Sequence, residues 1–125
     1  MSGNGVLLDS VIIIDHLNGV AAATGFLQTC GGAACISPIT RAEVLTGLEG
    51  RERQLAARFL DCFQFLPIDR ETTDLAAELR RAQRWRPPDA FQAAVAQIHG
   101  LRLATRNTAD FNPRRHSFVM VPYTL

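Results

Sequence analysis

The chain has 125 residues, 47% of them hydrophobic, which predicts one domain (residues 1–125) able to bury its own core. No run of about eighteen apolar residues occurs, so we expect no membrane association. The apolar start lacks the preceding basic region of a secretory signal. The three cysteines lack the spacing of a metal site, and we interpret them as reduced thiols of a cytoplasmic protein.

The net charge of +1 conceals an asymmetry between the two parts of the chain. Residues 1–79 carry five arginines against ten acidic residues, a formal −5, and residues 80–125 carry eight arginines against two acidic residues, a formal +6. All thirteen basic residues are arginine, whose planar guanidinium suits phosphate oxygens. The asymmetry favours an anionic partner such as nucleic acid, although any single arginine is equally well explained as part of a solvated face.

The first part of the chain alternates short apolar runs with helical patterns. Residues 5–9 predict a buried strand that ends in an acid, and residues 33–37 predict a second strand. Four helices are expected around them, at residues 11–19, 20–31, 38–49 and 54–62. The β-branched run 11–14 also fits a strand, and we expect a helix because residues 15–19 resemble a helix end. Ser10 is the expected cap of that helix.

The second part continues the alternation. Residues 63–68 predict an edge strand, which Pro67 supports, and a long amphipathic helix follows from about Asp69 to Trp85. Further elements are expected at residues 87–100 (helix), 101–105 (strand) and 117–121 (strand). The resulting order β-α-α-β-α-α-β-α-α-β-β predicts an α/β fold, a three-layer α/β/α domain with a mostly parallel central sheet.

Acidic and amide side chains occur at comparable places in these elements. Asp9 ends the first strand, Glu43 lies on the helix after the second strand, Asp89 opens a later helix, and Asn107 and Asp110 follow the fourth strand. In a parallel sheet these groups converge at one edge. Clustered carboxylates need a cation, and oxygen ligands suit Mg²⁺ or Mn²⁺, which can activate water for in-line attack on a phosphodiester. Taken singly, three of the acids have structural explanations. Asp9 could cap the following helix, Asp89 could be a charge at a helix N-terminus, and Asp110 could be a turn former.

Four motifs together resemble one family. They are Leu8–Ser10 followed by Asp15, then Ser37–Glu43, Pro88–Ala90 and Ala104–Phe111. In this order, and over the whole chain, they resemble PIN-domain proteins, and most of all the VapC toxins of bacterial type II toxin–antitoxin pairs. The resemblance implies a metal-dependent endoribonuclease that hydrolyses RNA phosphodiester bonds, is neutralised by a small antitoxin and is usually a homodimer.

The resemblance also implies roles for individual residues. Asp9, Glu43 and Asp89 match the three acids that hold the catalytic metal, Mg²⁺ or Mn²⁺. The fourth acidic position of many members falls on Asn107, which keeps an oxygen but no charge. Asp110 either compensates for that loss as a metal ligand or only shapes the turn.

Further positions match the family less closely. Ser10 and Thr105 match hydroxyl positions near the metal site, whereas Val11 departs from the Asn or Ser often found there. Asp15 matches a common acid after the first motif, and we expect it to be structural or peripheral.

The basic residues provide candidates for substrate binding. Arg80, Arg84, Arg86 and Arg106 are predicted to grip the RNA backbone. Trp85 could stack on a base, although an aromatic residue at a helix end is more often a packing or dimer contact. The implied mechanism is in-line attack by metal-activated water, with no covalent enzyme intermediate.

Two other classes of protein share part of this pattern. A phosphorelay receiver domain has similar size and architecture, but it needs a lysine, and this chain has none. A catalytically weak or inactive PIN-like module that binds RNA or a protein partner without cutting is the alternative, because of Asn107. Since clustered acids repel one another, removing either Asp9 or Asp89 is expected to abolish cleavage and leave the fold at least as stable.

Overall fold

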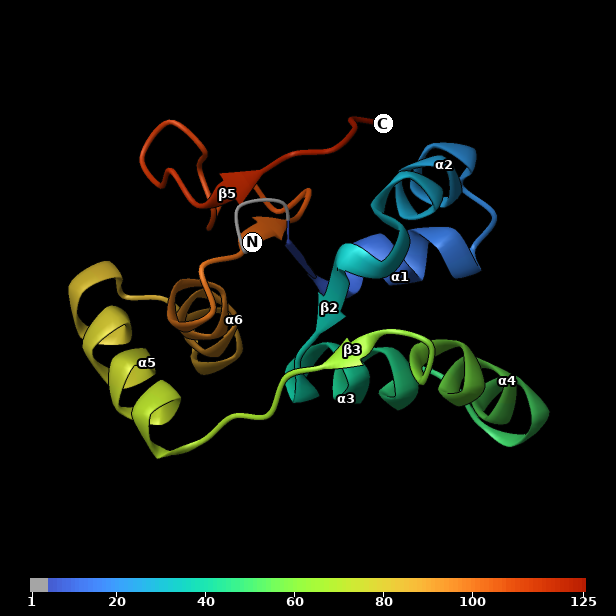
Figure 1. Cartoon of the computed structure of the whole chain (residues 1–125), viewed down its shortest axis with the longest axis horizontal. Coiled ribbons are helices and arrows are strands. Elements are labelled where there is room, and N and C mark those ends of the chain that lie inside the picture. The colour runs from blue at the N-terminus through green and yellow to red at the C-terminus, as the bar shows by residue number, and fades with distance from the viewer. Residues whose placement is uncertain (1–4) are drawn as a thin grey trace.

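A computed structural model describes residues 5–125 and contains a parallel sheet between two layers of helices (Figure 1). The strand order is β3-β2-β1-β4-β5, and every pairing is parallel. The strands are β1 (Val6–Leu8), β2 (Ala34–Ile36), β3 (Gln64–Phe65), β4 (Arg102–Ala104) and β5 (Val119–Met120). The predicted three-layer α/β/α architecture is confirmed. None of the helices within residues 5–125 is both long and apolar enough to cross a bilayer.

Six α-helices cover the sheet in the predicted order. They are α1 (Ser10–Leu17), α2 (Ala21–Cys30), α3 (Pro38–Thr46), α4 (Gly50–Leu60), α5 (Arg70–Gln83) and α6 (Pro87–Ile98), and a short 3₁₀ turn, η2 (Gly31–Ala33), precedes β2. The ambiguous run 11–14 is helical, as expected. Two boundaries were predicted wrongly: α3 ends three residues earlier than residue 49, at Thr46, and α4 begins at Gly50 rather than at residue 54.

Polar side chains fix the starts of three helices. Ser37 caps α3 by accepting hydrogen bonds from the amides of residues 39 and 40, and Asp69 caps α5 by accepting one from the amide of Thr72. The predicted cap of α1 was one residue off, because Asp9 rather than Ser10 is the N-cap and accepts from the Ser10 amide at 2.9 Å. The acid that ends β1 therefore also starts α1.

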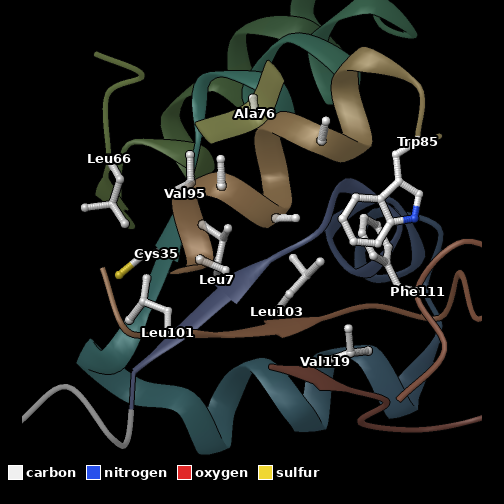
Figure 2. Packing of buried hydrophobic residues seen from close by; sticks show 14 residues of the cluster. Leu7, Cys35, Leu66, Ala76, Trp85, Val95, Leu101, Leu103, Phe111 and Val119 are labelled. Atoms are coloured by element: carbon white, nitrogen blue, oxygen red, sulfur yellow. The ribbon is translucent and has the colours of Figure 1, made fainter. Parts of the chain in front are cut away.

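Side chains alternate between the two faces of the sheet. On one face, Leu7, Leu103 and Val119 pack against α5 and α6 (Figure 2). On the other face, Leu8 and its neighbours pack against α1, α3 and α4. Figure 1 shows the pair α5 and α6 on one side of the sheet and α1 to α4 on the other. Successive residues of a strand therefore contact opposite helix layers.

Trp85 belongs to the first of these cores. It is 6% exposed, its ring lies 5.1 Å from that of Phe111, and its indole N–H donates to the backbone carbonyl of Asp110 at 2.9 Å (Figure 2). The packing interpretation of Trp85 is confirmed, and its buried ring is not available for stacking on a base. The three cysteines are free thiols, as expected.

Candidate active site

The carboxyl ends of three neighbouring strands create the site. Because β1 lies between β2 and β4 in a parallel sheet, the residues that follow these strands stand side by side. They are Asp9, Ser37 and Thr105, all buried. A backbone hydrogen bond from Asp9 N–H to the Ala104 carbonyl, 3.0 Å long, extends the β1–β4 pairing into this edge.

Three donors hold the Asp9 carboxylate in one orientation. Its Oδ1 accepts from the Ser10 amide at 2.9 Å and from Gln92 Nε2 at 3.3 Å. Its Oδ2 accepts from the Thr105 hydroxyl at 2.7 Å. A carboxylate has about four acceptor positions, so these bonds leave one position on Oδ2 for a cation or a substrate group.

Gln92 of α6 is the centre of a buried polar network that the sequence analysis missed. It is 1% exposed; its Oε1 accepts from the Ser37 hydroxyl at 2.6 Å and its Nε2 donates to Thr40 Oγ1 at 2.7 Å. Thr40 in turn donates to the Leu8 carbonyl at 2.8 Å. The network ties α6, α3 and β1 together directly beneath Asp9. The available signal was an amide within the apolar run of residues 90–96, where a buried polar group needs partners.

Glu43 reaches the same edge from α3. Its side chain is exposed, and Oε1 accepts a hydrogen bond from the Ser10 hydroxyl at 2.7 Å. Ser10 thus contacts two predicted metal ligands at once, with its amide on Asp9 and its hydroxyl on Glu43.

Asp89 in the first turn of α6 experiences the charge of the other acids. Partial burial and then repulsion from Asp110, Asp9 and Glu43, in that order, together raise its pKa to about 6. The positive charge of Arg86 opposes these effects. Three carboxylates from separate parts of the chain therefore lie near enough to Asp89 to raise its pKa.

Such a cluster of acids fits a divalent cation by the chemistry of its donors, since oxygen ligands and net negative charge are what Mg²⁺ and Mn²⁺ need. As they stand, no three His, Cys, Asp or Glu side chains of residues 5–125 are arranged to hold a metal ion. The assignment of these acids as metal ligands stays a prediction.

Asn107 and Asp110 form a turn of their own after β4. Asn107 Nδ2 donates to Asp110 Oδ2 at 2.9 Å, and the Asp110 amide donates back to Asn107 Oδ1 at 3.4 Å. The Asn107 amide donates to the Thr105 hydroxyl at 3.0 Å. The turn is thereby coupled to Asp9 through Thr105, and the remaining Asp110 carboxylate oxygen faces solvent.

Arg106 is engaged away from this cluster. Its guanidinium forms a two-pronged ion pair with Asp15 of α1 at 2.6 and 2.9 Å, and the Tyr123 hydroxyl donates to the same carboxylate at 2.9 Å. These bonds, with Arg106 as the largest cause, hold the pKa of Asp15 below its usual value. Asp15 is structural, as expected, and the predicted role of Arg106 in gripping RNA competes with this pair.

The other predicted substrate-binding arginines are exposed. Arg80 lies in the last turn of α5, Arg84 caps that helix, and Arg86 immediately precedes α6. They lie between the last turn of α5 and the start of α6, and Asp89 follows Arg86 by three residues.

Comparisons with known proteins agree with this fold. The family model of the PIN domain matches residues 6–113. Over 113 residues the chain is 34% identical to ribonuclease VapC10 of Mycobacterium tuberculosis, covering 85% of each protein. A solved toxin–antitoxin complex from Klebsiella pneumoniae matches with a TM-score of 0.88 and 32% identity, over 97% of this chain and 100% of that one. FitAcB from Neisseria gonorrhoeae matches with a TM-score of 0.77 and 25% identity, over 96% and 99%.

Proposed function

The chain belongs to the PIN-domain family, and on this premise we propose that it is a divalent-metal-dependent endoribonuclease that hydrolyses RNA phosphodiester bonds. The observation that carries the proposal is the position of Asp89, a partly buried carboxylate near Asp110, Asp9 and Glu43; burial and these charges together raise its pKa to about 6. Acids that repel one another in a cleft destabilise the protein unless a cation enters. A ribonuclease relative at 34% identity supports RNA as the substrate.

We propose Asp9, Glu43 and Asp89 as the residues that hold Mg²⁺ or Mn²⁺, with Asn107 and Asp110 as further oxygen donors. Such an ion, when bound, lowers the pKa of water and neutralises charge on the phosphate. The protein's own contribution is orientation: Ser10, Gln92 and Thr105 fix the Asp9 carboxylate, and Ser10 also holds Glu43. A cleft held in place in this way needs little rearrangement when RNA arrives.

We further propose that the protein is the toxin of a type II toxin–antitoxin pair, acts in the cytoplasm as a homodimer, and is neutralised by a cognate antitoxin. The support is likeness: the relative from Klebsiella pneumoniae was solved as a toxin–antitoxin complex and covers 97% of this chain.

The direct test is incubation of the purified protein with total RNA and either Mg²⁺ or Mn²⁺, with the cut ends mapped. We expect cleavage that disappears with a chelator and with Asp89→Asn, which changes a single oxygen to nitrogen. Asp74→Asn is the matched control, because Asp74 is an exposed acid of α5 that has no part in the cluster. Cleavage that persists in Asp89→Asn, or disappears in Asp74→Asn, contradicts the proposal.

One observation favours the alternative of a binding module that does not cut. Asn107 replaces an acid, and its amide is engaged with Asp110 rather than free for a cation. Calorimetric titration with Mn²⁺ separates the two functions. Heat that vanishes in Asp89→Asn supports the nuclease, and absence of heat in the wild-type protein supports the binding module.

A further inference from the structure

Two hollows lie in series around the end of α5 and share one arginine. The first, about 490 Å³, is lined by Ala77, Arg80, Arg81, Arg84 and Trp85. The second, about 200 Å³, has Arg84 and Trp85 in common with the first and adds Asp110, Arg115 and His116 among its walls. We call the surface formed by Arg80, Arg81, Arg84 and Arg115 the arginine groove.

The charges of the arginine groove are not balanced by the protein. Within residues 5–125 the ion pairs join Arg41 to Asp61 and Arg106 to Asp15, so the groove arginines have none. Arg80 lies in the last turn of α5 and Arg84 is the C-cap of the same helix, so two like charges stand at one helix end. The negative end of the α5 dipole favours Arg80 and Arg81 but does not explain Arg115, which comes from the loop between β4 and β5.

The backbone of Arg84 is strained at the point where the two hollows meet. Its φ is +59°, which makes it the one non-glycine residue with positive φ in the described part of the chain. Glycine is the usual residue at such a helix end, because a Cβ destabilises this conformation. An arginine in a backbone conformation that favours glycine indicates that the side chain of Arg84 has a role at this position.

The groove also leads to the acids. Asp110 is a wall of the second hollow, and it is the strongest charged influence on Asp89. The hydrogen bond from Trp85 Nε1 to the Asp110 carbonyl, 2.9 Å long, fixes the end of α5 to the loop that carries Asp110. The distance between arginines and acids is therefore set by a buried contact, not by a mobile loop.

We propose that the arginine groove binds the phosphate backbone of a single RNA strand on one side of the scissile phosphate. The inference rests on the proposed function, because it takes the acids as the place of cleavage. Guanidinium groups in a row along a groove suit successive phosphates of one strand. Since Trp85 is 6% exposed and its ring is packed in the core, the groove contacts the backbone mainly through its arginines and reads little base sequence on this flank.

The test uses the full-length protein in a chelator, so that no cutting occurs, and a fluorescein-labelled oligoribonucleotide of mixed sequence followed by anisotropy. Arg84→Gly and Arg115→Gln are the groove variants. Arg51→Gln is the matched control, because Arg51 is an exposed arginine of α4, on the other face of the sheet. We expect each groove variant to bind about 3- to 10-fold more weakly and to reduce the salt dependence by about one phosphate contact, with the control changed less than about 2-fold.

Arg84→Gly guards against loss through unfolding, because glycine relieves the positive φ and should keep or raise the Tm. Weaker binding with an unchanged or higher Tm supports the groove. Binding equal to wild type, or an equal loss in Arg51→Gln, overturns it. Its failure is separable from that of the nuclease proposal: Asp89-dependent cleavage with normal binding by the groove variants removes only the groove, and Arg84-dependent binding without metal-dependent cleavage removes only the nuclease.

Discussion

Asp15 of α1 and Asp89 of α6 are both carboxylates on helices that cover the sheet, yet their surroundings are opposite. Asp15 is 7% exposed and receives hydrogen bonds from Arg106 and Tyr123, so its pKa is lowered. Asp89 is less buried and faces three other acids, so its pKa is raised to about 6. The first acid has its counter-charge inside the protein.

The difference distinguishes an acid whose charge is balanced within the protein, Asp15, from one whose charge is not, Asp89. The buried Asp15 carboxylate has hydrogen bonds from Arg106 and Tyr123, and a further ligand could bind it only by displacing one of them. The Asp89 carboxylate lies close to like charges, so its ionised form would be stabilised by a bound cation.

The largest effect on stability is expected from breaking the ion pair between Arg106 and Asp15. Arg106→Ala leaves the Asp15 carboxylate buried with only Tyr123 as donor, which should cost about 2–3 kcal/mol of the free energy of unfolding. Urea denaturation measures this loss. The double variant Asp15→Leu/Arg106→Leu should recover much of it, and failure to recover would mean that Arg106 acts through contacts other than Asp15.

Removing the charge of Asp89 should change the stability in the opposite direction. Asp89→Asn is expected to increase stability at pH 7 by about 1–2 kcal/mol, after allowance for solvent screening. The folded protein retains the Asp89 proton between its ordinary pKa of 3.8 and its folded pKa of about 6, so wild-type stability falls as pH rises through this window. The variant should therefore match wild type near pH 4 and exceed it above pH 6. Thermal denaturation across that range measures the difference, and a gap independent of pH would contradict it.

A third variant tests the support under the site. Gln92→Leu keeps the volume but leaves the Ser37 hydroxyl without its acceptor, a loss of about 1–2 kcal/mol. It also removes one donor from Asp9, so Mn²⁺ affinity should fall several-fold. Gln97→Leu, at an exposed position of the same helix, is the control. Equal Mn²⁺ affinity in Gln92→Leu and wild type would show that Ser10 and Thr105 suffice to orient Asp9.

The smallest effect concerns the turn after β4. Asn107→Asp brings a second carboxylate against Asp110 Oδ2, which now accepts from the Asn107 amide at 2.9 Å. We expect a loss of about 0.5 kcal/mol without metal and a few-fold stronger Mn²⁺ binding. Calorimetry with and without Mn²⁺ measures both, and weaker binding would place Asn107 outside the metal site.

The structure changes one expectation about the acids themselves. From the sequence, removal of Asp9 should relieve repulsion as removal of Asp89 does. In the fold, Asp9 accepts from Gln92 and Thr105 in the buried interior, so Asp9→Ala would leave the Thr105 hydroxyl without its acceptor and Gln92 Nε2 with Thr40 alone. Only Asp89, with no such bonds, keeps the simple expectation.

Much of the fold was predictable because its signals are local. Prolines at helix starts, glycine at helix ends and short apolar runs placed the elements in the right order, and the parallel sheet then brought Asp9 and Asp89 to one edge. Edge-strand length was less predictable: β3 pairs over two residues of the six expected.

The remaining features depend on partners distant in sequence. The Arg106–Asp15 pair spans 91 residues, and nothing near Arg106 distinguishes it from the exposed arginines. Gln92 lies among alanines and a valine, where helical periodicity records only an apolar face. Such contacts are decided by how the layers pack, which no local pattern specifies.

The central place of β1 has a consequence for when the protein becomes active. Asp9 is made early, yet Thr105, the donor to its Oδ2, follows 96 residues later, and β4 is the neighbour that completes the edge. During translation the growing polypeptide therefore lacks an assembled cleft until most of it has left the ribosome. The acids that we propose as the active centre are therefore not completed by their Thr105 donor until nearly all of the chain has been made.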